Sequence, residues 1–235
     1  MLTPKTLQKL QSEQKKLDEF IVQKKNITDA DSQKSFIRTK IALLVEIGEL
    51  ANELKTFKHW KSQKEVNWDK AKEELIDCLH FYLSWANSFQ IDFGDYKFHK
   101  LVPETDYNEL LLALFSETEA FSVNVPWKVL KPKMIASQKK IWEDAVNKLN
   151  PEDKDYKKDV ESFQGIKEKT KKDIEKMSNN FLKGINEEKS KANFYRWLIV
   201  FEELAQKLGM RSEKDIENSY MAKNKINWER QKGNY

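Results

Sequence analysis

The segment LIDCLHFYLSWANSF, at residues 75–89, decides the fold of this chain. Drawn as a helix, the segment is apolar on almost every side, which is typical of a helix buried at the centre of a bundle. Neither this segment nor any other apolar run approaches the roughly 18 residues that a membrane-spanning helix needs. The sequence therefore predicts an all-α protein with a central helix over residues 69–90 and no membrane span.

The composition of the whole chain agrees with this fold class. Only six Gly and five Pro occur in 235 residues, which leaves little turn chemistry for a protein of many short strands. The single cysteine, Cys78, excludes an internal disulfide framework. Residues 1–14 lack the apolar region of a secretory signal. We therefore expect a cytoplasmic protein, or one in the host-cell cytoplasm if a phage encodes it.

Amphipathic helices are predicted on both sides of the central one. Thr3 and Pro4 read as an N-cap followed by proline at the first helical position, so a first helix begins there. Gly209 follows a strongly apolar segment and is expected to end its helix. The spacing of apolar residues places helices at about residues 4–21, 35–58, 69–90, 107–122 and 194–208, with a last one from about Ser212. Polar connections are expected at residues 26–34, 61–68 and 103–106.

The middle of the chain, residues 124–191, differs from the rest in composition. Its lysines outnumber its acids and alternate with them, and it contains no arginine. This pattern is typical of a solvated helical surface, since a polyanion-binding domain would gather arginine and aromatic residues with its lysines. Weaker helices are expected here, punctuated by Pro126, Pro132, Pro151 and Gly165. We therefore predict one all-α domain, residues 1–235, with a Lys/Glu-rich helical insertion or subdomain at residues 124–191.

Acidic residues recur at helical spacing on the second and third predicted helices. Glu46 and Glu49 lie three residues apart and Glu53 continues their stripe, so like charges share one face. On the next helix Glu74 and Asp77 repeat the spacing, and Asp77 is embedded in the apolar segment. A buried unpaired carboxylate is costly, and a divalent cation shared by both pairs of acids removes that cost. Oxygen ligands without a cysteine or histidine cluster suit Mg²⁺, or Mn²⁺, rather than zinc.

The spacing also permits a reading without a metal. Charged stripes on amphipathic helices are usually solvated, and Lys55, Lys58 and Lys72 are near enough in sequence to pair with the acids. His80 follows Asp77 by about one helical turn, and a single histidine in an apolar helix is more often a satisfied core residue than a functional one. Spacing alone leaves both readings open.

Two aromatic residues are candidates for contacts with a sugar or a base. Phe81 falls on the same side of its helix as the acids, so its ring could stack on a ligand or pack against a neighbouring helix. Trp60 lies in FKHWK, residues 57–61, where its ring could meet a base and Lys58 could meet phosphates. A tryptophan that seals the end of the second helix is the alternative.

The last helix carries a polar stripe. Lys223, Asn227 and Arg230 lie at i, i+4 and i+7, which places two cations and an amide on one face. The stripe suits a triphosphate and a sugar hydroxyl, because ammonium and guanidinium groups neutralise phosphate oxygens. A solvated basic end that complements the helix dipole would give the same pattern.

Together these residues resemble the dimeric all-α dUTPase family, a branch of the all-α nucleoside triphosphate pyrophosphatases related to the MazG proteins. The resemblance covers roughly residues 10–89 and 194–235 and rests on motifs in the family's order. The motifs are Gln14-x-x-Leu17-Asp18, Glu46-x-x-Glu49-Leu50 followed by FKHWK, EELIDCLHFYLS at residues 73–84, and Tyr220-x-x-Lys223-Asn224-x-x-Asn227-x-x-Arg230-Gln231-x-Gly233-x-Tyr235.

The resemblance implies a helical bundle in which residues 1–235 form the catalytic domain, and a homodimer. It also implies Mg²⁺-dependent hydrolysis of dUTP to dUMP and pyrophosphate by attack of water on the triphosphate. By the resemblance, the magnesium ligands would be Glu46, Glu49, Glu74 and Asp77, with Glu49 also orienting the water. The substrate contacts would be Lys58, Lys223 and Arg230 for phosphates, Gln14, Trp60 and His80 for uracil, and Phe81 and Asn227 for deoxyribose. Asp18, where some members carry asparagine, is also expected in the substrate site.

Two other functions stay open. A related pyrophosphatase, such as a dCTPase-dUTPase or a MazG-like enzyme, would use the same acids with another base, and Gln14, Trp60 and His80 argue for uracil. A non-enzymatic helical binding protein would use the middle segment to contact nucleic acid or a regulatory protein, with strong dependence on salt. We expect no sequence-specific nucleic acid partner, and the binding reading leaves Asp77 unexplained.

Overall fold

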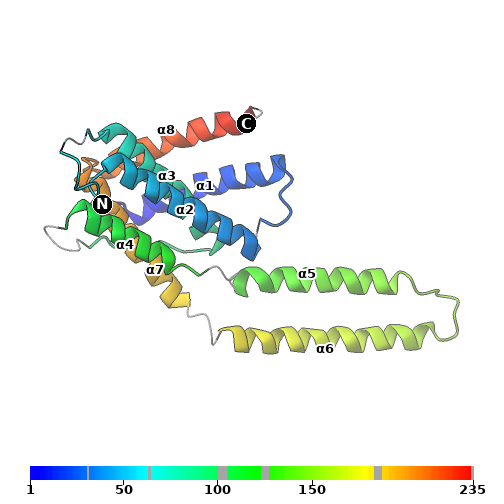
Figure 1. Cartoon of the computed structure of the whole chain (residues 1–235). Helices are drawn as coiled ribbons and strands as arrows, with labels where there is room; N and C mark the ends of the chain where they lie inside the picture. The colour runs from blue at the N-terminus through cyan, green and yellow to red at the C-terminus, as the bar shows by residue number, and fades with distance from the viewer. Residues whose placement is uncertain (31, 63–64, 100–104, 123–126, 183–186, 234–235) are drawn as a thin grey trace. The chain divides into compact units, whose positions relative to one another are not determined.

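A computed structural model of the chain describes residues 1–30, 32–62, 65–99, 105–122, 127–182 and 187–233, and these residues form eight α-helices and no strand (Figure 1). The helices are α1 (Pro4–Lys24), α2 (Gln33–Leu54), α3 (Trp68–Ser88), α4 (Tyr107–Glu119), α5 (Trp127–Val146), α6 (Tyr156–Leu182), α7 (Glu187–Lys207) and α8 (Glu213–Lys232). The all-α class is confirmed. Within these ranges no helix is both long and apolar enough to cross a membrane.

The chain divides into two compact units. The first contains Met1–Asn124 and Glu188–Tyr235, and the second contains Val125–Glu187. In the first unit α3 packs against α1, α2 and α8, and α2 also contacts α4 (Figure 1). In the second unit α5 and α6 lie side by side as a helical hairpin. The first unit therefore joins the two ends of the chain around α3.

The core of the first unit is built on α3, as the segment at residues 75–89 predicts. Tyr82 of α3 stacks on Trp197 of α7, with ring centroids 4.2 Å apart. The Tyr82 hydroxyl donates a hydrogen bond of 3.0 Å to the carbonyl of Phe194, and Trp197 Nε1 donates to Thr118 Oγ1 on α4 at 2.9 Å. Each ring of this kind buries roughly 150–250 Å² of surface, so these contacts anchor α3, α4 and α7 to one another.

Local signals define several helix ends correctly. Thr3 caps α1 by accepting a hydrogen bond from the backbone N–H of Thr6, and Pro4 is the first helical residue. Ser212 caps α8 in a reciprocal capping box with Asp215. After α7, Gly209 adopts a left-handed conformation with φ of +88°, and the N–H of Met210 bonds to the carbonyl of Ala205. These predictions are confirmed.

Other predicted ends are wrong. Helix α2 stops at Leu54 rather than at residue 58, because Lys55 adopts a left-handed conformation with φ of 55°. FKHWK therefore follows α2 as a turn instead of closing the helix. Helix α7 begins at Glu187, before the predicted residue 194, since its first turns are too polar to show apolar periodicity.

Pro132 and Gly165 do not interrupt helices as predicted. Pro132 lies inside α5 and Gly165 lies inside α6. Pro132 removes one backbone hydrogen bond near the start of α5, and its side chain is exposed, so water can satisfy the freed carbonyl. Gly165 has no atom within 4 Å of the position of a Cβ, so packing does not require a glycine there. Two further predicted breaks, Pro103 and Pro126, lie outside the described residues.

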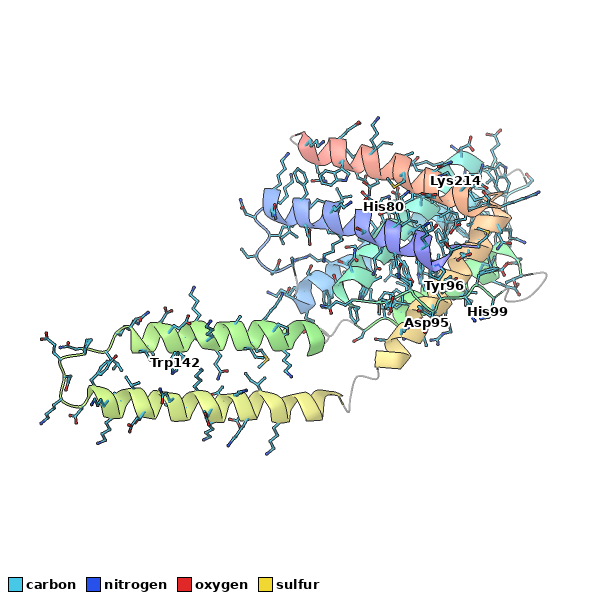
Figure 2. All side chains as sticks on the ribbon, turned by 180° about the vertical axis from the view of Figure 1, so that it is seen from behind. His80, Asp95, Tyr96, His99, Trp142 and Lys214 are labelled. Carbon is cyan, nitrogen blue, oxygen red and sulfur yellow. The ribbon has the colours of Figure 1, made fainter. Side chains whose placement is uncertain are left out.

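The hairpin of the second unit has a thin core. Trp142 lies between α5 and α6 (Figure 2), with Lys167 Nζ 4.2 Å from the centre of its ring. Ile174 is buried, whereas Ile141 and Ile166 are exposed. Two helices bury apolar side chains only along the line where they face each other. The stability of this unit therefore depends on few apolar contacts.

Candidate functional site

Three acidic residues converge where α2 meets α3. Carboxylate oxygens of Glu46, Glu74 and Asp77 all lie within 4.8 Å of one another. Glu46 comes from α2, and the other two come from consecutive turns of α3. Glu74 is only 3% exposed, while Glu46 and Asp77 are half-buried. We call these three residues the acidic cluster.

Glu49, the fourth predicted ligand, lies outside this group. Its side chain is exposed on α2, one turn after Glu46. Its charge nevertheless acts on the cluster, because it is among the carboxylates that raise the pKa of Glu46. The structure thus brings three of the four predicted acids together and leaves Glu49 at their solvent side.

The cluster is electrostatically strained. Burial raises the pKa of Glu46 to about 7, and the charges of Asp77, Glu49 and Glu74 add to the effect. Burial also raises the pKa of Asp77, although hydrogen bonding from Lys223 opposes this shift. A nearby positive charge would stabilise the ionised form of these closely spaced carboxylates.

Two lysines supply positive charge to these acids, and neither is among Lys55, Lys58 and Lys72, which the sequence offered as partners for them. Lys223 Nζ on α8 lies 2.6 Å from Asp77 Oδ2 and 2.7 Å from Glu73 Oε1. Lys70 Nζ lies 2.9 Å from Glu74 Oε1 and 3.0 Å from Glu73 Oε2. Lys70 precedes Glu74 by four residues, a spacing that could have identified the pair.

The lysines proposed in the reading without a metal pair elsewhere. Lys55 Nζ donates to the carbonyl of Glu65, Lys58 Nζ donates to Asn52 Oδ1, and Lys72 Nζ pairs with Asp69. The acids of the cluster therefore pair with Lys70 and Lys223 instead of the three lysines of that reading, and they are buried or half-buried rather than solvated.

The donor set of the acidic cluster fits a divalent cation. It offers carboxylate oxygens from two helices and no sulfur ligand, which suits a hard ion such as Mg²⁺ or Mn²⁺. A cation at this position would also lower the raised pKa of Glu46, since it favours the ionised carboxylate. The positions of these acids thus agree with the predicted metal site.

A cleft of about 340 Å³ lies beside the acidic cluster. Its walls come from α1, α2, α3 and α8. Nine predicted site residues line it, namely Gln14, Asp18, Glu46, Asp77, His80, Phe81, Lys223, Asn227 and Arg230. The lining thus combines carboxylates of α2 and α3 with the cations Lys223 and Arg230 of α8, so an anionic ligand and its metal could be held together.

Lys58 and Trp60 do not line this cleft. Because α2 ends at Leu54, both residues lie in the turn that follows it. Trp60 is 64% exposed and makes edge contacts with Phe57 and His59. The C-terminal motif is also only partly visible, since Asn234 and Tyr235 lie outside the described residues.

Gln14, at the wall of the cleft, is held by three hydrogen bonds. Its Oε1 accepts one of 2.8 Å from the Tyr220 hydroxyl and lies 2.7 Å from His80 Nδ1. Its Nε2 donates one of 2.8 Å to Asp18 Oδ1. Figure 2 shows His80 between α1 and α8. The hydrogen bond of Tyr220 to Gln14 could not be read from helical spacing, because it joins residues 206 positions apart.

Burial controls the charges of this group. It lowers the pKa of His80 to about 3, with the charge of Lys223 acting in the same direction, so the imidazole is neutral near pH 7. It raises the pKa of Asp18 to about 6, against the hydrogen bond from Gln14. This wall of the cleft therefore presents a neutral histidine and a carboxylate that ionises above about pH 6.

A second cavity of about 480 Å³ adjoins the cleft. The two share Asp18, Ile21 and Ser84 as lining residues, and none of the acidic cluster lines the larger cavity. Asp18 thus stands between the two spaces.

A family model described as dUTPase matches residues 6–235, which includes the Lys-rich middle segment. No curated protein and no solved structure matches the chain.

Proposed function

The chain belongs to the all-α dUTPase family, whose members hydrolyse dUTP, and from this premise we propose that the reaction takes place in the cleft with Mg²⁺ bound at the acidic cluster. The observation that carries the proposal is the convergence of Glu46, Glu74 and Asp77 beside a cleft whose lining includes Glu46, Asp77, Lys223 and Arg230. We propose Glu49 as a further ligand. Mn²⁺ is the alternative metal, since it shares the preference for carboxylate oxygens.

The metal would neutralise the triphosphate and lower the pKa of an attacking water. Lys223 and Arg230 would bind phosphate oxygens, as ammonium and guanidinium groups do in phosphoryl-transfer sites. Glu49 would orient the water, and its exposed position leaves it accessible to solvent. Phe81 would pack on the deoxyribose, and Asn227 would hydrogen-bond it. The products would be dUMP and pyrophosphate.

We propose that Gln14, Asp18 and His80 bind the base. They lie together on one wall of the cleft, and their hydrogen bonds to one another hold them in place. Trp60 would join them, and Lys58 would reach the phosphates, only through movement of the 57–61 turn, since both residues lie outside the cleft.

A homodimer is part of the proposal. Ile37, Ile41 and Val45 recur every four residues on α2 and are 41%, 56% and 50% exposed. An exposed apolar stripe of this length commonly marks an interface. We propose that a second copy of the chain covers it, and Ile41→Glu should then yield monomers in sedimentation velocity. The cytoplasmic location stays a prediction from the sequence.

A dCTPase-dUTPase is the second candidate. Asp18 lines the cleft and can accept hydrogen bonds when ionised, so it would suit a base with an exocyclic amine such as cytosine. The non-enzymatic reading of the whole chain no longer applies, because the chain belongs to an enzyme family.

A substrate panel tests the proposal. Pyrophosphate release would be measured from dUTP, dCTP, dTTP, dATP, dGTP and UTP, each with Mg²⁺ and with excess EDTA. We expect Mg²⁺-dependent release from dUTP alone. Release from dUTP and dCTP would favour the second candidate, and full activity in EDTA would contradict the metal site.

A further inference from the structure

Tyr220 on α8 contacts two of the three residues proposed to bind the base, Gln14 and His80. It is fully buried, and its hydroxyl donates a hydrogen bond of 2.8 Å to Gln14 Oε1. Its ring stacks on the imidazole of His80, with centroids 4.1 Å apart and planes inclined by 16°. Tyr220 is not itself among the residues that line the cleft. It therefore acts on the cleft only through Gln14 and His80.

The neighbours of the Tyr220 hydroxyl fix the direction of its hydrogen bond. The carbonyl of Leu10 lies 3.4 Å away and the side-chain carbonyl of Gln14 lies 2.8 Å away, and both groups can only accept. At the other end of Gln14, Nε2 donates to Asp18 Oδ1. Turning the amide over would set Gln14 Oε1 against the Asp18 carboxylate. The Gln14 carbonyl therefore faces Tyr220 and His80.

This orientation determines which ring nitrogen of His80 carries the proton. Gln14 Oε1 accepts only, and it lies 2.7 Å from His80 Nδ1, so Nδ1 must be the donor. A neutral imidazole has a single N–H, which leaves Nε2 with a lone pair. His80 is only 5% exposed, and its Nε2 is buried without a hydrogen-bond partner among the described residues. The wall thus contains an unsatisfied acceptor.

We propose that Tyr220 is a positioning residue for base selection, which holds Gln14 and His80 so that His80 Nε2 accepts a hydrogen bond from an N–H of the substrate base. The inference rests on the proposed function, because it assigns the base to this wall of the cleft. Uracil carries N–H at ring position 3, whereas cytosine carries a lone pair there. If the lone pair of His80 Nε2 is held facing this ring position, it favours uracil. It repels cytosine, because two lone pairs cannot form a hydrogen bond with each other.

The first test is the tautomer of His80 in the wild-type chain. Long-range proton–nitrogen NMR distinguishes an Nδ1 proton from an Nε2 proton, and only three histidines need assignment. His59→Gln and His99→Gln identify the remaining signal as that of His80. We expect the proton on Nδ1. A proton on Nε2 would overturn the inference even if dUTP is the substrate. An Nδ1 proton in a chain that does not hydrolyse dUTP would overturn the proposed function instead and leave the hydrogen-bond direction supported.

The second test removes only the hydroxyl of Tyr220. Tyr220→Phe keeps the ring that stacks on His80, and we expect kcat/KM for dUTP to fall about tenfold while the Ki of competing dCTP changes less than about threefold. Tyr82→Phe is the matched control, because it also removes one buried hydroxyl donor, in the core between α3 and α7. The control should lose thermal stability without a change in the ratio of the two constants. Equal losses for both nucleotides in Tyr220→Phe would show a merely structural role and overturn the inference.

Discussion

The ammonium nitrogen of Lys223 lies 2.6 Å from Oδ2 of Asp77, so a cation of α8 neutralises a member of the acidic cluster on α3. The same nitrogen lies 2.7 Å from Glu73 Oε1. Burial disfavours the charged form of Lys223, yet hydrogen bonds to Asp77 and Glu73 outweigh this effect and raise its pKa. In the proposed mechanism, Asp77 would help to hold the divalent cation, and the ammonium of Lys223 would bind the phosphates instead of Asp77.

Replacing Lys223 should separate metal binding from turnover. In Lys223→Met, Mg²⁺ no longer competes with an ammonium for Asp77, so its affinity in the absence of nucleotide should rise several-fold. Loss of a phosphate contact should lower kcat/KM about 100-fold. Isothermal titration and steady-state kinetics measure the two effects, and Lys214→Met, an exposed lysine of α8 paired with Glu217, is the control. Weaker Mg²⁺ binding in Lys223→Met would contradict the competition.

Glu49 tests the metal site without disturbing the fold. Its side chain is exposed on α2, so Glu49→Gln should leave the melting temperature within about 2 °C of the wild type. Turnover of dUTP should fall by at least about 100-fold, because an amide keeps the shape and removes a ligand charge. Glu53→Gln, one turn further along α2, should retain activity. Unchanged turnover in Glu49→Gln would remove Glu49 from the site.

Asp18 should give the protein a measurable dependence on pH. Burial raises its pKa to about 6 in the folded chain, whereas an unfolded aspartate ionises near pH 3.9. Ionisation therefore favours the unfolded state, and folding stability is lost as pH rises from about 4 through 6. Asp18→Asn lacks this penalty and should be more stable than the wild type at pH 8, with the difference vanishing near pH 3.5.

Urea denaturation of both chains at the two pH values measures this difference. His80 also makes stability depend on pH, because its lowered pKa makes the folded chain more stable as pH rises. Both chains contain His80, so this contribution cancels in the difference between wild type and variant. A wild type that is the more stable of the two at pH 8 would show that Asp18 ionises without cost.

The hairpin of α5 and α6 should respond to loss of the Trp142 ring. Trp142→Ala removes the side chain that lies between the two helices, and we expect amide hydrogen exchange in residues 127–182 to accelerate at least about tenfold. Activity on dUTP should stay within about twofold, because all residues of the proposed site belong to the other unit. Ile141→Ala, at an exposed neighbouring position, should change neither quantity.

Local rules predicted those parts of the fold that depend on neighbours in sequence. The cap at Thr3, the helix start near Ser212 and the helix end at Gly209 depend on backbone groups within one turn, so a short segment is enough to identify them. The end of α2 was missed because Lys55, and not a glycine or asparagine, takes the left-handed conformation. Helices α5 and α6 continue through Pro132 and Gly165, where pairing of the two helices outweighs local propensity.

In the candidate site too, local patterns were predictable and contacts between distant residues were not. Helical periodicity placed Glu46 and Asp77 on faces that could meet, and the structure brings them together. Periodicity says nothing about which distant lysine neutralises an acid, so the role of Lys223 at Asp77 could not be read from the sequence. The contact of Tyr220 with Gln14 was inaccessible for the same reason.

The hydrogen bond between Tyr220 and Gln14 closes a loop of 206 residues, within which the whole of Val125–Glu187 is contained. The entropy of closing a loop grows only with the logarithm of its length, so lengthening it by this unit costs on the order of a few tenths of a kcal/mol. The presence of this unit therefore adds little thermodynamic burden to the site. Its consequence is kinetic, since the two halves of the binding wall meet only after nearly the entire chain has left the ribosome.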